Sequence, residues 1–133
     1  MGFKTIQAGD MILAKVITPD WNDGLNYYSD QSDFIQAGTW RYNEGKELSA
    51  HVHNLVERKV NRTQEILYVR KGKISASFYD QDGIFVESTL VSEGETLILI
   101  NGGHGYKILE DDTLVLEIKN GPYLGADLDR KRI

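Results

Sequence analysis

The sequence predicts an all-β fold, an antiparallel double-sheet jelly roll. Runs of strand length follow one another at close spacing and are separated by turn residues. Helical periodicity is nearly absent, which is typical of a sandwich or barrel rather than of alternating strands and helices. A small domain built from many short strands has to cover their edges, and a jelly roll does so with two sheets.

The individual strands are predicted from alternation and turn signals. We expect strands over residues 11–18, 33–42, 64–71, 73–80, 84–91, 96–101, 106–110 and 113–120. The pairs Lys71-Gly72 and Asp82-Gly83 lie between runs and predict hairpin turns. Residues 19–33 are polar and rich in turn formers, so we expect a long loop or lid there.

Two of the runs carry information on what covers them. Residues 96–101, TLILIN, are apolar on both faces, which predicts a strand buried on both sides, by a second sheet or by a partner subunit. The run 113–120 alternates, with Leu114, Leu116 and Ile118 on one face. Because the apolar run and an open barrel edge both require cover, we expect a homodimer.

Composition limits the class of protein. The chain has 133 residues, of which 41% are hydrophobic, so we expect one domain over 1–133, with a barrel over 33–120, an N-terminal strand and loop over 1–32 and a tail over 121–133. There is no cysteine, which excludes disulfides and thiolate metal sites. The start of the chain has no secretory pattern and no run is long enough to span a membrane, so we expect a cytoplasmic protein. Its net charge of -5 and scattered basic residues argue against a nucleic-acid partner and favour a small molecule.

Two of the three histidines stand one residue apart in the segment GKELSAHVHN, residues 45–54. In an extended chain, His51 and His53 leave the same face, and in a barrel strand that face would be the interior. Glu65 begins the next predicted strand, and His104 follows the apolar run between glycines. Three imidazoles and one carboxylate suit a divalent transition metal such as zinc, iron, manganese, nickel or copper.

These residues resemble the motifs of the cupin superfamily. Gly45, five residues and then His51-Val52-His53 match the first motif, and Glu65 stands before ILYVRK and Gly72 as the family's glutamate stands before its glycine. The segment between His53 and Glu65 is longer than is usual, so Glu57, which is separated from His53 by three residues, is the alternative carboxylate. The second motif is similar to GETLILINGGHGYKI, which gives His104 the position of the last histidine, although the usual proline is absent. The similarity covers 33–120.

The resemblance implies a jelly-roll barrel with a metal held by His51, His53, Glu65 and His104. It is strongest to small single-domain cupins of sugar and surface-polysaccharide metabolism. We therefore expect a Lewis-acid isomerase acting on a sugar-like or hydroxy-keto substrate, with oxygen chemistry if the metal is iron. Two alternatives stay open: a metal-free nucleotide-sugar ketoisomerase or epimerase that uses the histidine pair as acid and base, and a sensor or binding module without catalysis.

Further residues are candidates for contacting the substrate. His51 and His53 are candidate catalytic residues, and Tyr106, two residues after His104, joins them. Trp40 is a candidate wall of the substrate site, although an aromatic face is more often core packing. Arg58 and Arg62 lie in the loop beside the predicted site, where they could hold a phosphate or carboxylate, or simply be solvated.

Overall fold

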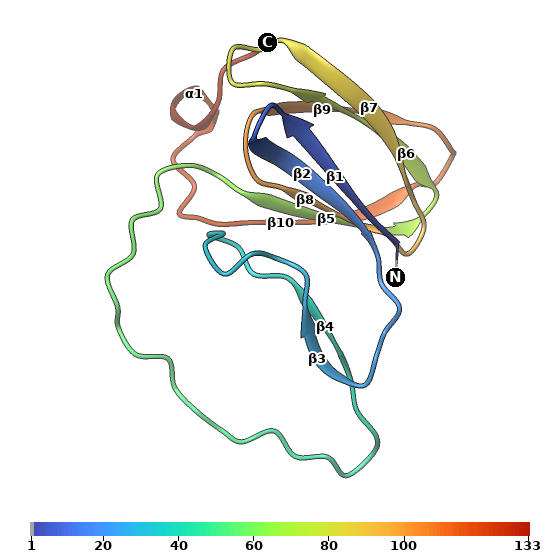
Figure 1. Cartoon of the computed structure of the whole chain (residues 1–133), viewed down its shortest axis with the longest axis vertical. Helices are drawn as coiled ribbons and strands as arrows, with labels where there is room; N and C mark the ends of the chain where they lie inside the picture. The colour runs from blue at the N-terminus through green and yellow to red at the C-terminus, as the bar shows by residue number, and fades with distance from the viewer. Residues whose placement is uncertain (1) are drawn as a thin grey trace.

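The computed structural model describes residues 2–133, and its regular secondary structure is almost entirely β-strand. Within those residues there are ten strands and one short helix (Figure 1). They are β1 (Gly2–Ala8), β2 (Met11–Thr18), β3 (Gly24–Tyr27), β4 (Gly38–Arg41), β5 (Glu65–Lys71), β6 (Lys73–Tyr79), β7 (Phe85–Ser92), β8 (Thr96–Leu99), β9 (Gly103–Ile108), β10 (Leu114–Lys119) and α1 (Ala126–Asp129).

The strands form two facing sheets and a separate hairpin. The larger sheet has the order β1-β2-β8-β5-β10, the smaller sheet has the order β7-β6-β9, and β3 pairs only with β4. Every pairing is antiparallel. The predicted antiparallel all-β class is therefore confirmed. The described strands do not close into a barrel, because β9 and β10 each end their sheet with no neighbouring strand.

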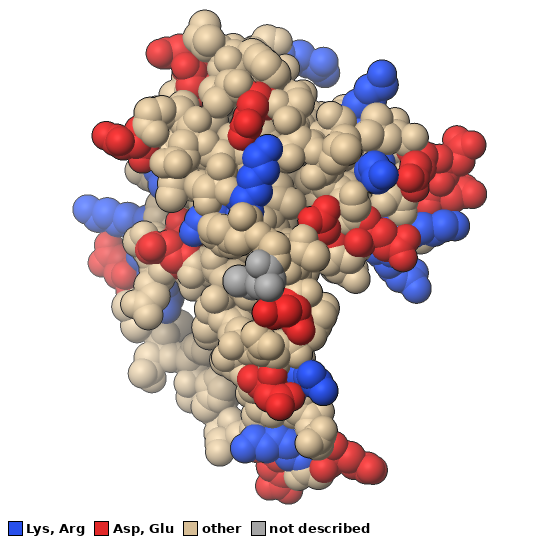
Figure 2. Space-filling view, turned by 45° about the vertical axis from the view of Figure 1, so that its right-hand side comes forward, with Lys and Arg blue, Asp and Glu red and all other residues tan. Residues whose placement is uncertain are grey.

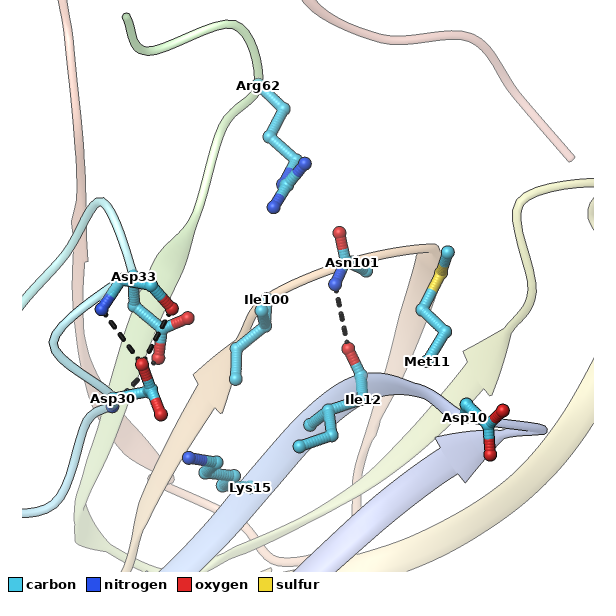
Figure 3. A pocket seen from close by; sticks show the side chains of 10 residues that line it. Asp10, Met11, Ile12, Lys15, Asp30, Asp33, Arg62, Ile100 and Asn101 are labelled. Carbon is cyan, nitrogen blue, oxygen red and sulfur yellow. Dashed lines mark hydrogen bonds between the residues drawn. The ribbon is translucent and has the colours of Figure 1, made fainter. Parts of the chain in front are cut away.

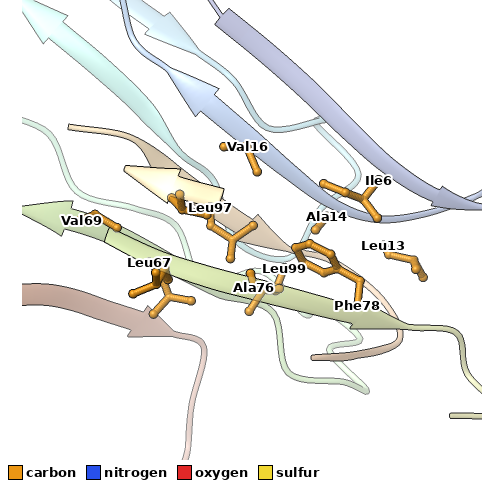
Figure 4. Close-up of a cluster of buried hydrophobic side chains, with 12 residues drawn as sticks. Ile6, Leu13, Ala14, Val16, Leu67, Val69, Ala76, Phe78, Leu97 and Leu99 are labelled. Atoms are coloured by element: carbon orange, nitrogen blue, oxygen red, sulfur yellow. The ribbon is translucent and has the colours of Figure 1, made fainter. Parts of the chain in front are cut away.

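The main core lies between the two sheets and follows from period-two alternation. On β6, Ile74, Ala76 and Phe78 point inward and are essentially unexposed, while the residues between them face outward. Leu97 and Leu99 of β8 meet them from the larger sheet in one cluster (Figure 4). Full burial of each large aliphatic or aromatic side chain contributes about 1.5–3 kcal/mol.

A second, smaller cluster lies on the outer face of the larger sheet. It contains Ile17, Ile66, Ile98 and Ile100, and residues 28–37 of the same chain cover it. This explains the apolar character of 96–101 on both faces. The prediction that this strand is buried on both sides is confirmed, and its two covers are the smaller sheet and residues 28–37.

The covering segment is tied to the sheet by the fully buried side chain of Gln64. Its Oε1 atom accepts hydrogen bonds from the backbone N–H groups of Phe34 (2.8 Å) and Ile35 (3.2 Å). The hydroxyl groups of Tyr28 and Thr39 are 2.8 Å apart and hydrogen-bonded. These contacts fix the base of the β3–β4 hairpin, which projects beyond the sandwich (Figure 1).

Three local predictions need correction. Gly72 does not turn a hairpin, because β5 belongs to the larger sheet and β6 to the smaller one. The glycine has φ +85° where the chain crosses between the sheets, a conformation that side chains disfavour. The strand predicted over 33–42 is reduced to β4, because 28–37 lies across the apolar sheet face instead of extending. The loop predicted over 19–33 contains β3.

The remaining predicted strands agree with those of the structure to within about three residues, whereas β1 had no predicted counterpart of its own. The hairpin at Asp82-Gly83 is confirmed, since β6 and β7 pair directly across it. In the tail, α1 is only four residues long. No helix within residues 2–133 has the length and apolar character needed to cross a membrane.

The two sides of the sandwich differ. On one side β1 and β7 are linked by Lys4, whose Nζ atom lies 3.2 Å from Thr89 Oγ1 and 3.7 Å from a carboxylate oxygen of Glu87. On the other side β9 and β10 each end their sheet without a neighbouring strand, and we call this side the open seam.

Candidate metal centre

Glu65 and His104 meet between the two sheets beside the open seam. Glu65 is the first residue of β5 and shares its inward face with Leu67 and Val69 of the main core. His104 lies opposite Phe78 in the β6–β9 pairing and therefore also faces inward. The Nε2 atom of His104 is 2.9 Å from Oε2 of Glu65, and the Glu65 side chain is only 9% exposed.

The contact between these two groups has the length of a hydrogen bond but poor alignment. Although His104 Nε2 is close, the buried Oε2 atom of Glu65 has no hydrogen-bond partner with acceptable geometry. The hydrogen bond that His104 offers the Glu65 carboxylate is therefore poorly aligned. A carboxylate oxygen and an imidazole nitrogen are also atom types that first-row metal ions take as ligands.

Charged groups of β10 complete the surroundings of Glu65. In the β5–β10 register, Lys119 lies opposite Glu65, and its Nζ atom is 3.5 Å from Oε1 of that carboxylate. Glu117 faces the same side, 3.9 Å from Lys119. The contact with His104 lowers the pKa of the Glu65 carboxyl, and Lys119 adds to this, while desolvation by burial acts in the opposite direction. Glu65 is therefore ionised near neutral pH.

Tyr106 stands next to this pair on β9. Its ring centroid lies 5.3 Å from that of His104, and both residues face inward because they are two positions apart in one strand. Burial of the phenol raises its pKa well above the usual value, and the charges of Glu65 and Glu117 raise it further. The residue is still 40% exposed as a whole. At neutral pH Tyr106 keeps its proton and can donate a hydrogen bond.

His51 and His53 lie elsewhere. They belong to a stretch that we call the arm, residues 42–62, in which every residue is exposed and none is in a strand (Figure 1). Their ring centroids are 5.0 Å apart, and His51 Nδ1 lies 3.1 Å from the carbonyl oxygen of Ser49. The alternation of polar and apolar residues around His51 is compatible with a strand, but within the described residues no strand pairs with this segment. Across residues 2–133, no three histidine or carboxylate side chains gather closely enough to hold an ion.

The other candidate residues are spread over the arm and the hairpin. Glu57 and Arg58 are exposed in the arm, so the carboxylate beside His104 is Glu65. Trp40 is 62% exposed on β4 and packs edge-on against Tyr42 at 6.4 Å, outside the main core. The Arg62 guanidinium lies over the Phe34 ring at 5.0 Å, a cation–π contact.

Arg62 also borders an open hollow of about 580 Å³ on the outer side of the larger sheet (Figure 3). Asp30, Asp33 and Lys15 line it together with Asn101, whose side-chain amide donates to the carbonyl oxygen of Ile12 (2.9 Å). Its charges are mixed, and neither Glu65 nor His104 lines it. The hollow is therefore separate from the inter-sheet pair.

Comparison with known proteins adds no relative. No family model, curated protein or solved structure matches this chain. The resemblance to cupins thus depends only on the sequence motifs around His51, Glu65 and His104. Inferences about function depend on the contact between Glu65 and His104.

Sequence reasoning missed Glu117 and Lys119 as members of the site. The signal was present, because the run 113–120 places them on the face opposite its leucines. From the sequence alone this polar face is expected to be solvent-exposed, whereas the β5–β10 register turns it toward the space between the sheets.

The molecular surface carries no large patch of a single charge on the face shown in Figure 2, where acidic and basic side chains are interspersed.

Proposed function

We propose that this protein is a metal-binding cupin-type jelly roll that acts on a small polar substrate, sugar-like or hydroxy-keto, by Lewis-acid isomerisation. The observation that carries the proposal is the buried Glu65 carboxylate beside the His104 imidazole. Burial of a carboxylate is costly unless something compensates its charge. Lys119, at 3.5 Å and partly exposed, supplies part of that compensation.

The separation of the pair fits two ligands of one ion. Nitrogen and oxygen ligands lie about 2.1 Å from a first-row divalent metal, so two ligands at right angles are about 3.0 Å apart. The observed 2.9 Å between His104 Nε2 and Glu65 Oε2 agrees with this value. The poor alignment for a hydrogen bond, which leaves Oε2 without a partner, supports the same interpretation.

Two ligands are too few for a stable site, so the arm supplies the others in this proposal. His51 and His53 would add their imidazoles if residues 47–53 extended along the free edge of β9. Both rings would then leave one face of the new strand, toward the inter-sheet space. The resulting set of three imidazoles and one carboxylate suits zinc, iron, manganese or nickel.

When bound, such an ion polarises an oxygen of the substrate and lowers the pKa of groups attached to it. The protein's own residues provide the remaining chemistry. Tyr106, held protonated, donates a hydrogen bond to a substrate oxygen at the same opening. Phe78 and Leu99 form an apolar floor that excludes water on the core side. Arg58, Arg62 and Trp40 are proposed to contact more distant parts of the substrate.

A second candidate is a metal-free isomerase or epimerase. The contact of His104 with Glu65, next to a protonated Tyr106, is what favours it, because a carboxylate can orient an imidazole for proton transfer. In that version His51 and His53 act as acid and base on the substrate. A sensor that binds a ligand without converting it is the third possibility.

Elemental analysis of the purified protein separates these candidates. About one first-row metal ion per chain is expected, with its loss in Glu65→Gln and in His104→Ala. Glu57→Gln is the matched control, since Glu57 is exposed in the arm, and should keep the metal. Loss of one ligand should weaken binding by more than the roughly 10–100-fold that a change around the ligands produces.

Each other outcome identifies a different function. Metal-free protein whose isomerase activity depends on the histidines would replace the proposal with acid–base catalysis. A tightly held small molecule that stays unchanged through long incubation would replace it with a sensor. Metal retained in Glu65→Gln but lost in Glu57→Gln would contradict the assignment of the carboxylate.

A further inference from the structure

The inner face of β9 lacks a cover. Tyr106 and Ile108 lie opposite Ala76 and Ile74 in the β6–β9 register, and those two partners are buried in the main core. Yet Tyr106 is 40% and Ile108 is 59% exposed. An inward-facing position in a sandwich is normally buried, so the free edge of β9 has room for a further strand.

The arm is apolar enough to form such a strand, but its apolar side chains do not pack against the rest of the protein. Leu48, Val52, Leu55 and Val56 are all exposed, Val52 to 88% and Leu55 fully. Within the described residues, the hydrogen bonds of the arm are local, such as the one from the Lys46 N–H to the carbonyl oxygen of Asn43 (3.2 Å), or lie at its C-terminal end. A cluster of this kind on a solvent-exposed segment indicates an interaction site.

The hairpin decides the direction in which the arm leaves. Its base is fixed to the larger sheet by the Gln64 hydrogen bonds and by the packing of Tyr28 in the smaller cluster, and β4 runs outward from that base (Figure 1). The arm begins at the far end of β4, beyond the sandwich. The hairpin itself exposes a second apolar surface, with Leu25, Tyr27 and Trp40 between 47% and 62% exposed. The start of the arm is thus directed away from the free edge of its own β9.

We propose that the arm of each copy adds as a strand along β9 of a second copy, so that two chains exchange arms in a symmetric dimer. Exchange of identical elements would pair the backbone groups of the free β9 edge and bury the apolar side chains of the arm in both copies. His51 and His53 of one chain then join Glu65 and His104 of the other, and each site is shared. The sharing of the site rests on the proposed metal function, whereas the exchange itself does not.

Mixing two defective variants tests the shared site. One variant carries His51→Ala and His53→Ala, and the other carries Glu65→Gln and His104→Ala. Refolded together, half of the dimers should be mixed, and each mixed dimer should hold one site with all four ligands. Metal content should then recover to about one quarter of the wild-type value. No recovery would mean that the arm closes on its own chain, which would overturn the exchange.

Cross-linking tests the exchange without using the metal. Ordinary and heavy-nitrogen copies are refolded together and treated with a lysine-reactive cross-linker. Links from Lys46 or Lys59 of the arm to Lys107 of β9 should contain both isotopes. Links within single-isotope chains only would refute the proposal, as would a monomer in analytical ultracentrifugation. Mixed links in a protein that binds no metal would refute the proposed function and leave the exchange intact.

A pair of substitutions shows whether the arm holds the dimer. Val52→Asp with Leu55→Asp should produce monomers that retain the β-sheet circular dichroism spectrum, because these residues contribute nothing to the main core. Ile84→Asp is the control, since Ile84 is 63% exposed at the β6–β7 turn. This control should remain dimeric. A dimer that survives both arm substitutions would contradict the exchange.

Discussion

Replacement of Gln64 by leucine should release the segment that covers the outer face of the larger sheet. The Gln64 side chain is fully buried and is the acceptor for the N–H groups of Phe34 and Ile35. A buried donor left without a partner costs about 1–3 kcal/mol. Both N–H groups are only partly buried, so we take the lower end for each and expect a loss of about 2 kcal/mol in total.

The loss should be visible both globally and locally. For a chain of this size the melting temperature should fall by about 8 °C, and the urea midpoint should fall without a change in slope. Amide hydrogen exchange at Phe34 and Ile35 should accelerate. Gln7→Leu is the control, because Gln7 is exposed on β1 and its replacement should cost less than about 0.5 kcal/mol. Equal stability of the Gln64 and Gln7 variants, with unchanged exchange at both amides, would refute this account of how the segment is held.

Three further predictions concern the core, one turn and the pH dependence. Phe78→Ala should lower the free energy of unfolding, measured in urea, by about 3–5 kcal/mol, because Phe78 is buried in the main core. Phe85→Ala, at a position that is 56% exposed, should lower it by less than about 1 kcal/mol, and similar losses in the two variants would contradict the assigned core. Gly102→Ala should lower the melting temperature more than Gly94→Ala, because both have positive φ but only at Gly102 would the added Cβ collide with a backbone carbonyl group. Because the pKa of Glu65 is lowered on folding, its contribution to stability exists at neutral pH and is lost as pH falls. In chelator-treated protein, the unfolding free energies of wild type and Glu65→Gln should therefore converge between about pH 5 and pH 3, and a gap independent of pH would count against the ionised carboxylate.

The sequence was informative wherever alternation and local turns decide the structure. Strand β6 could be predicted from the inward residues Ile74, Ala76 and Phe78, and its hairpin to β7 from Asp82-Gly83. The place of β8 between two covers followed from its apolar character on both faces. Such features depend on neighbours a few residues away, or on burial alone.

Pairings between distant segments could not be predicted in this way. A glycine between two strands is compatible with a hairpin or with a crossing between sheets, and at Gly72 only the sheet order decides. The alternation around His51 predicted an extended chain, but which edge pairs with it depends on the direction set by the β3–β4 hairpin. Glu65 and His104 come together because β5 and β9 lie in facing sheets, a relation that neither stretch encodes locally.

The side-chain link between β1 and β7 has a mechanical consequence. Side-chain contacts join the two sheets at β1 and β7, whereas β9 and β10 are free edges, so the two sheets can move apart more easily at the open seam. We therefore expect thermal fluctuations to open the sandwich at the β9 and β10 edges before they disturb the linked side, since local opening begins where the fewest contacts must break. Glu65 and His104 thus lie beside the edge at which we expect the sandwich to open, where a small molecule would enter with little disturbance of the packed interior.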